Sequence, residues 1–303
     1  MRRTSNLFAC ALALLASSCK KDEPPQEAPK PATPEPEVDS LRVAEGDPPV
    51  DGPVPPETSM VFFGVEGSLY PLACYDAAKK ALLSGEPCLA MVPAGAEVRV
   101  ASEDAEYNKV AGERAEPHCL IGSGKNVAVA VEGITEGASF FYGVWPRSTM
   151  KLVKPVDRDS TSPRATQLGS DEVTKLSAAV KAKGGSVGDE LRAHQVAEVD
   201  LDGQGKPDKV YSVFVPDPSI SEQYRWSGLF LAPEGNLDGL VFIAQSKSKR
   251  DVFEVRGTVD LDGDGQRELW TRMVFEEGAG DRIVTFQDGK PKAVGDWSCG
   301  AGV

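Results

Sequence analysis

One acidic loop occurs twice near the end of the chain, and it constrains the fold more than any other feature. It reads Asp-Leu-Asp-Gly-Asp-Gly-Gln-Arg-Glu at 260–268 and Asp-Leu-Asp-Gly-Gln-Gly-Lys-Pro-Asp at 200–208. Carboxylates at alternate positions place oxygens on one side of a tight loop, and glycine permits the left-handed backbone that such a loop needs. Converging hard oxygens are the ligands that calcium prefers. The sequence therefore predicts two calcium-type loops.

The strands predicted around the two loops repeat in the same order. They are expected at 191–199, 209–215, 224–232 and 240–245, and again at 251–259, 269–275, 282–287 and 291–297. Asp-Gly pairs at 238–239 and 288–289 predict hairpin turns. Since the loops begin at residues 200 and 260, the pattern indicates an internal repeat.

The loop pattern D-x-D-G-D-G-x-x-D between two strands resembles the FG-GAP/VCBS repeats, over about 110 residues of this chain. For the second loop, the resemblance implies calcium ligands at Asp260, Asp262, Asp264, the Gln266 carbonyl and Glu268. For the first loop, it implies ligands at Asp200, Asp202, Gln204, the Lys206 carbonyl and Asp208. Because Gln204 is neutral, we expect the second loop to bind more strongly. One or two ions are expected, and the alternative is a pair of Asx-turn hairpins without an ion.

The predicted architecture is mainly β with two short helices. Residues 58–153 are expected to form a small β-rich domain, with strands at 60–65, 97–101, 126–132 and 139–145 and one helix over 74–83. Residues 154–169 read as a linker. A helix over 170–183 then opens an antiparallel two-repeat β domain, 170–303, whose repeats are either propeller-blade-like or two packed sheets.

The N-terminal residues are typical of an export signal. Arg2 and Arg3 precede an apolar run, 7–16, which is too short to span a bilayer. The sequence Ala-Ser-Ser-Cys that ends at Cys19 resembles a bacterial lipobox. The resemblance implies that Cys19 carries a lipid, becomes the first residue of the mature protein and anchors it in a membrane. The residue directly after Cys19 is Lys20 and not the aspartate of a retention signal, which favours the outer membrane. The alternative is an ordinary secreted protein cleaved nearby.

Residues 20–57 are predicted to be a disordered tether. The stretch 22–57 holds 11 of the chain's 23 prolines, with 10 acidic residues and two basic ones. Proline restricts the backbone and like charges repel, so this composition favours an extended, unfolded spacer.

Four cysteines remain once Cys10 in the signal and Cys19 are set aside: Cys74, Cys88, Cys119 and Cys299. In an exported protein they predict two disulfides, and the sequence allows three pairings. We favour Cys74–Cys88, around the helix predicted there, with Cys119–Cys299 as the second bridge. A zinc site is the rival interpretation, but only two histidines and no C-x-x-C motif are present.

Charge and motifs narrow the function to three classes. The formal net charge of −13 argues against binding to nucleic acid. No catalytic signature is found, so we favour a protein that is not an enzyme. The favoured class is an envelope lipoprotein whose calcium-stabilised head binds or scaffolds an unknown envelope protein or polymer. The alternatives are a structural subunit of an envelope or secretion assembly and a hydrolase of envelope polymers.

Overall fold

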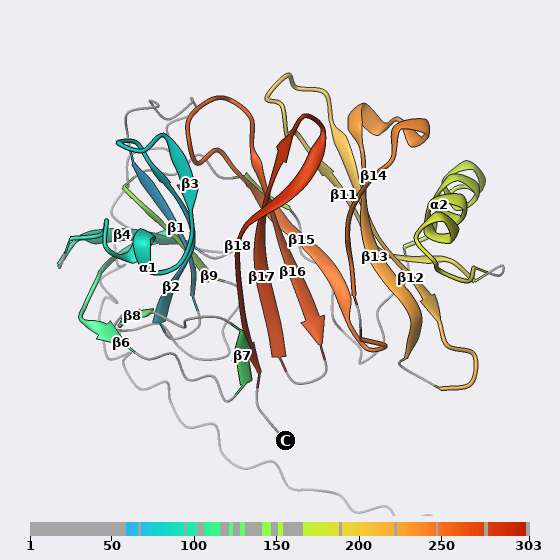
Figure 1. Cartoon of the computed structure of the whole chain (residues 1–303), viewed down its shortest axis with the longest axis horizontal. Coiled ribbons are helices and arrows are strands. Elements are labelled where there is room, and N and C mark those ends of the chain that lie inside the picture. The colour runs from blue at the N-terminus through green and yellow to red at the C-terminus, as the bar shows by residue number, and fades with distance from the viewer. Residues whose placement is uncertain are drawn as a thin grey trace, which may run out of the picture. The chain divides into compact units, whose positions relative to one another are not determined.

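A computed structural model (Figure 1) describes residues 59–65, 68–93, 95–101, 106–115, 121–123, 128–130, 141–146, 151–153, 166–187, 190–220, 223–246, 248–275 and 278–300. These residues belong to one compact unit, which is mainly β with two short helices, as predicted. The predicted signal segment 1–19, the tether 20–57 and residues 154–165 of the predicted linker lie outside this set. Within it, neither helix combines the length and the apolar character that crossing a membrane requires.

The first sheet comes from residues before 146. Its strands follow the order β5-β4-β9-β1-β2-β8-β6, and β3 also pairs with β2. The bounds are β1 (Met60–Val65), β2 (Ser68–Asp76), β3 (Ala81–Leu83), β4 (Glu97–Ala101), β5 (Glu106–Val110), β6 (Arg114–Ala115), β8 (Ala128–Ala130) and β9 (Phe141–Trp145). The strands predicted at 60–65 and 97–101 are confirmed. Those predicted at 126–132 and 139–145 are found over shorter stretches.

The helix predicted over 74–83 is wrong. Strands β2 and β3 form a hairpin there, and the short helix α1 (Glu86–Leu89) comes after it. The Asp76 carboxylate stabilises the hairpin turn by accepting hydrogen bonds from the backbone amides of Ala78 and Lys79 at 3.1 and 3.2 Å.

The burial of β2 explains this error. Tyr70 and Leu72 pack in one hydrophobic core, whereas Leu69 and Cys74 pack in another, so both faces of the strand are covered. A strand buried on both faces is an unbroken apolar run without the alternation of a half-exposed strand. Periodicity alone does not distinguish such a run from a buried helix.

A disulfide joins Cys74 in β2 to Cys88 in α1, as predicted. Both residues are fully buried, and the bridge fastens α1 to the hairpin. Cys119 lies outside the described residues, as does the side chain of Cys299 in β18. Their pairing therefore stays a prediction.

The two sequence repeats form the core of two further antiparallel sheets. The four-stranded sheet has the order β11 (Arg192–Val199), β12 (Asp208–Pro216), β13 (Tyr224–Ala232) and β14 (Val241–Gln245). The six-stranded sheet has the order β10 (Lys151–Leu152), β15 (Val252–Val259), β16 (Glu268–Phe275), β17 (Gly278–Gln287), β18 (Lys290–Gly300) and β7 (Ile121–Ser123). All eight strands predicted for the repeats are confirmed.

The connections at the two Asp-Gly pairs differ. Asp288 and Gly289 adopt φ angles of 52° and 71° and form the tight turn between β17 and β18. The pair at 238–239 instead belongs to the second of two 3₁₀ turns, η1 (Pro233–Gly235) and η2 (Leu237–Gly239), which lead from β13 to β14.

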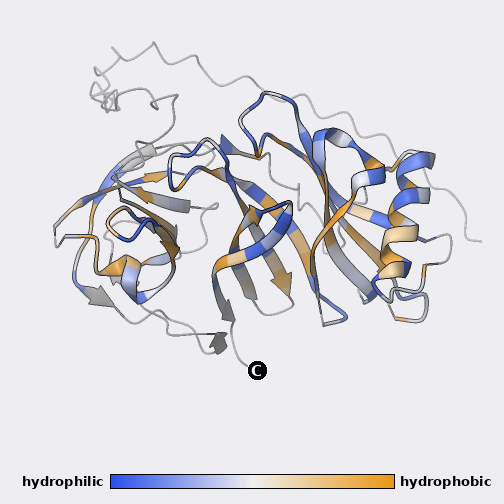
Figure 2. Ribbon diagram, turned by 45° about the horizontal axis from the view of Figure 1, so that its top comes forward, coloured by the Kyte–Doolittle hydropathy of each residue, from blue (hydrophilic) through white to orange (hydrophobic). Residues whose placement is uncertain are grey.

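The two repeats pack against each other as two sheets. Their shared core contains Leu229, Phe253, Val255 and Val284. The Gln195 side chain accepts a hydrogen bond from the Val255 amide at 2.6 Å and donates one to the Val255 carbonyl at 3.1 Å. Figure 2 shows that hydrophobic residues follow the strands, while hydrophilic residues gather in the loops that join them.

Strands from both sides of the predicted linker share the six-stranded sheet. β7 pairs with β18 and β10 pairs with β15, although both small strands precede residue 154. A common core also joins Phe62 and Tyr70 of the first sheet to Trp270 and Trp297. The helix α2 (Ser170–Ala182) covers the four-stranded sheet of the first repeat, against which its Leu176 and Val180 side chains pack.

A glycine permits the close approach of β18 to β2. A Cβ atom at Gly295 would lie 1.8 Å from the Leu72 carbonyl oxygen, which is backbone and cannot turn aside. We expect Gly295→Ala to lower the free energy of unfolding by about 3 kcal/mol, at the upper end for an overpacked core. Gly239→Ala is the control, because its Cβ would meet nothing closer than Asn236 Nδ2 at 3.5 Å. Equal urea midpoints for the two variants would contradict this account.

Candidate metal centre

The two acidic loops occupy equivalent places in the two repeats. The loop 200–207 joins β11 to β12, and the loop 260–267 joins β15 to β16. Each follows a strand whose last residue is buried, and each places a buried leucine, Leu201 or Leu261, at its second position. The glycines at 203, 205, 263 and 265 all have positive φ, between 70° and 88°. The predicted left-handed backbone is present in both loops.

The second loop brings three carboxylates together. Ligand oxygens of Asp260, Asp262 and Asp264 all lie within 4.8 Å of one another. Asp260 is only 2% exposed, Asp262 is half-buried and Asp264 faces solvent. This arrangement of hard oxygens could hold a metal ion.

Backbone amides hold these carboxylates in place. Asp260 accepts hydrogen bonds from the amides of Gly263 at 2.8 Å and Gly265 at 3.3 Å. Asp264 accepts one from the Gln266 amide at 2.7 Å. A carboxylate oxygen has more than one lone pair, so these contacts orient the side chains without using up their capacity to bind a cation.

The surroundings of three carboxyl groups in the second loop disfavour their ionised forms. Burial raises the pKa of Asp262 to about 6, and repulsion from Asp264 adds to the effect. Burial likewise raises the pKa of Glu268 to about 8, with further repulsion from Asp262 and Asp260. The pKa of Asp260 is also raised, mainly by burial. A bound cation would favour the ionised forms of these groups by offsetting both causes.

The last acidic residue of each loop is buried and makes the same contact. Glu268 Oε2 accepts a hydrogen bond from the Leu261 amide at 3.0 Å, and Asp208 Oδ2 accepts one from the Leu201 amide at 3.1 Å. Asp208 Oδ1 also accepts a hydrogen bond from the Glu234 amide at 2.8 Å. These residues therefore close their loops, and neither belongs to the three-carboxylate group.

The first loop is more exposed. Asp200 and Asp202 accept hydrogen bonds from the amides of Gly205 and Gln204, at 3.3 and 3.0 Å. The Lys206 ammonium contacts Glu234 at 3.1 Å. Within the described part of the chain, no group of three acidic, histidine or cysteine ligands converges at this loop. One oxygen of Asp200 is buried without a hydrogen-bond partner.

The two loops touch, which the sequence did not predict. The Arg267 amide donates a hydrogen bond to the Leu201 carbonyl at 2.7 Å. A Cβ atom at Gly203 would lie 2.8 Å from the Gly265 carbonyl oxygen. The absence of a side chain at Gly203 is thus required for the loops to approach, and this contact joins the two repeats at the candidate metal centre.

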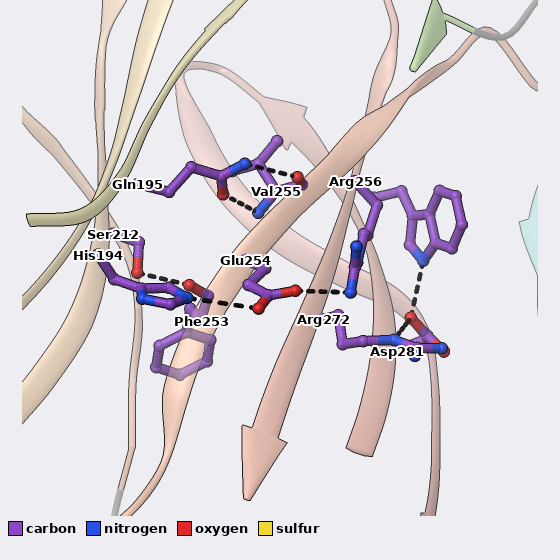
Figure 3. Close-up of polar contacts among 10 residues, drawn as sticks. His194, Gln195, Ser212, Phe253, Glu254, Val255, Arg256, Arg272 and Asp281 are labelled. Carbon is purple, nitrogen blue, oxygen red and sulfur yellow. Dashed lines mark hydrogen bonds and ion pairs between the residues drawn. The ribbon is translucent and has the colours of Figure 1, made fainter. Parts of the chain in front are cut away.

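Buried ionic groups between the sheets were also missed (Figure 3). Glu254 lies 2.6 Å from the Arg256 guanidinium and 3.3 Å from His194 Nε2, and all three residues are almost fully buried. Asp281 pairs with Arg272 on the next strand, with a shortest distance of 2.7 Å. The sequence does contain a sign of these groups, because charged residues lie within strands that are otherwise mostly apolar. A charge in such a position is buried together with a partner.

No protein-family model, curated protein sequence or solved structure matches this chain.

Proposed function

We propose that this protein is a membrane-anchored envelope lipoprotein whose β head is stabilised by calcium and acts as a binding or scaffolding module. The observation that carries the proposal is the convergence of Asp260, Asp262 and Asp264 within 4.8 Å at the second acidic loop. Calcium binds six to eight oxygen ligands, so carboxylates and backbone carbonyls of one flexible loop suit it.

The ligands proposed for calcium in the second loop are the three aspartates, the Gln266 carbonyl and Glu268, which lies outside the three-carboxylate group but near enough to Asp262 and Asp260 to be repelled by them. A divalent ion there would offset the repulsion among carboxylates and the effect of their burial. The first loop is proposed as the weaker site, because Gln204 supplies a neutral oxygen where the second loop has Asp264. The ion would lie where the two repeats meet, so its role is to stabilise the head.

Two features support an exported, anchored protein. The lipobox-like sequence ending at Cys19, followed by an acidic and proline-rich segment, is typical of a lipid anchor and a spacer. The disulfide between Cys74 and Cys88 is of the kind that persists in oxidising compartments outside the cytosol. We place the anchor in the outer membrane, and we propose an envelope protein or polymer as the partner.

Calcium titration tests the metal assignment. Since a ligand that binds only the folded state must stabilise it, calcium at about a hundredfold excess over its Kd is expected to raise the Tm by about 5–10 °C. Circular dichroism melts with calcium, magnesium and EGTA give the comparison. Magnesium should produce a smaller shift, because it demands a stricter octahedral geometry. An identical Tm in millimolar calcium and in EGTA would refute the proposal.

A further inference from the structure

A cleft of about 480 Å³ opens beside β14, and none of its lining residues belongs to the acidic loops. Its walls come from the end of β14, from the connection that leads to β15, and from strands β15 to β18. The volume lies within the range of about 300–1,000 Å³ that is usual for sites binding small molecules.

The floor of the cleft is apolar. Ile243, Phe253, Met273 and Val284 line it, and the same four residues belong to the core between the two repeat sheets. Ile243 and Met273 are only half-buried, in contrast to Phe253 and Val284. The core is therefore open to the cleft at these two side chains, and an apolar group placed there would remove them from water.

A buried carboxylate also lines the cleft. Asp251 is 6% exposed, and its Oδ2 accepts a hydrogen bond from the Ser246 hydroxyl at 2.7 Å. Among the described residues, no lysine, arginine or histidine pairs with Asp251, and no donor contacts its Oδ1. A buried charge is costly unless an opposite charge or several donors compensate it. In the described part of the chain, the Ser246 hydroxyl is the side-chain donor that Asp251 has.

The other charged groups of the cleft differ from Asp251. Arg282 and Asp296 lie 3.7 Å apart, and their side chains are 44% and 63% exposed. They can pair with each other and with water at the rim. Asp281, which also lines the cleft, is already paired with Arg272. Asp251 is thus the carboxylate of the cleft without a cationic partner among the described residues, and a cation would compensate its charge best.

We propose that the cleft binds a small organic cation: a primary amine or guanidinium carried on an apolar body. The cationic group would donate to Asp251, and the apolar body would cover Ile243 and Met273. Charge-assisted hydrogen bonds in a partly buried site are stronger than neutral ones, so the carboxylate selects an amine over an alcohol of the same shape. This inference specifies a ligand for the binding role proposed above. It does not depend on the calcium loops, so either proposal can fail alone.

Methionine methyl NMR on the chain gives a local readout. Met273 lines the cleft, while Met60 and Met91 pack in two other cores. The probes are 4-phenylbutylamine and its neutral counterpart 4-phenylbutanol, in EGTA at constant salt. Both should shift the Met273 methyl signal and leave those of Met60 and Met91 unchanged. The amine is expected to bind about tenfold more tightly, the effect of one charge-assisted contact.

Two variants distinguish a specific contact of the amine with Asp251 from a general attraction of the cationic probe to an acidic protein. Asp251→Asn keeps the shape of the side chain and should remove the roughly tenfold preference for the amine, while binding of the alcohol changes little. Asp296→Asn is the matched control, because it removes an exposed carboxylate of the same cleft and should preserve the preference. Ile243→Trp, which fills the cleft, should abolish binding of both probes.

Three results would overturn the proposal. They are equal affinity of the unaltered chain for the two probes, an unchanged preference in Asp251→Asn, and shifts of the Met60 and Met91 signals together with that of Met273. If Asp251→Asn fails to fold, the comparison of amine with alcohol on the unaltered chain decides the question.

Discussion

Replacing Asp281 by alanine is expected to lower the free energy of unfolding by about 3–5 kcal/mol, the cost of removing one partner from a buried ion pair. Asp281 is only 1% exposed. Its two oxygens accept hydrogen bonds from Arg272 Nε at 2.9 Å and Arg272 Nη2 at 2.7 Å. Trp270 Nε1 donates a third bond at 3.0 Å, and the Tyr70 hydroxyl donates a fourth at 2.8 Å. Alanine would leave these donors without their acceptor.

The loss of Asp281 should destabilise the packing of two sheets against each other. Tyr70 belongs to β2 of the first sheet, whereas Asp281 belongs to β17 of the six-stranded sheet, so their hydrogen bond ties the two together. Asp296→Ala is the matched control, since it removes an exposed carboxylate from neighbouring β18 and should cost at most about 0.5 kcal/mol. Urea denaturation of the two variants gives the comparison. A loss below about 1 kcal/mol for Asp281→Ala would mean that the network contributes little.

The lowered pKa of Asp281 also predicts that the fold loses stability in acid. Burial by itself would raise the pKa of Asp281, but the Arg272 guanidinium and the hydrogen bonds hold it below its ordinary value of 3.8. A carboxyl whose folded pKa is lowered stabilises the fold above its unfolded pKa, and this stabilisation is lost as the pH falls through the folded pKa. Between pH 5 and pH 2, unaltered protein should therefore lose more stability than Asp281→Ala. Parallel urea midpoints for the two proteins would contradict this.

Neutralising two carboxylates of the second acidic loop is expected to abolish most of the calcium-dependent rise in Tm, or roughly 5–10 °C at saturating calcium. Asp260→Asn with Asp262→Asn keeps the shapes of both side chains and retains an acceptor for the Gly263 amide. What it removes is the charge that a divalent ion requires. In EGTA the stability of the variant should differ little from that of the unaltered protein, because relief of the burial and repulsion of ionised Asp262 offsets the loss of the 3.3 Å contact between Asp260 and the Gly265 amide.

The first loop supplies the control for this double variant. Asp200→Asn with Asp202→Asn makes the same chemical change in the loop that has Gln204 and no three-carboxylate group among the described residues. It should reduce the calcium-dependent shift less than the change in the second loop. An equal loss from both variants would place the principal ion at the contact between the loops. Retention of the whole shift in the second-loop variant would exclude that loop as the site.

The strands of the repeats could be predicted because several local sequence patterns indicate the same strands and turns. Alternating or apolar strand sequences, acidic loops and Asp-Gly pairs recur in the same order, and the structure confirms all eight strands. The hairpin of β2 and β3 could not be predicted in this way. Its strand is covered on both faces by residues far away in the chain, so no local alternation marks it.

The candidate site was predicted only in part for a related reason. Spacing alone placed oxygens of Asp260, Asp262 and Asp264 on one side of a loop, and the structure brings them together. The contact of Arg267 with Leu201 depends on how the two repeats pack, and no pattern within either loop encodes it. The same holds for Asp251, whose position in a cleft depends on five separate strands.

Strand β18 completes a core that strands β1 and β2 begin, so this core depends on residues far apart in the chain. Trp297 of β18 stacks on Tyr70 with ring centroids 3.6 Å apart, and Gly295 meets the backbone of Leu72. These contacts join residues that are far apart in the chain, and closing a long loop costs entropy before the contact forms, so this core should form late in folding. A variant that lacks β18 would leave Tyr70 and Leu72 uncovered on this face and should be prone to aggregate.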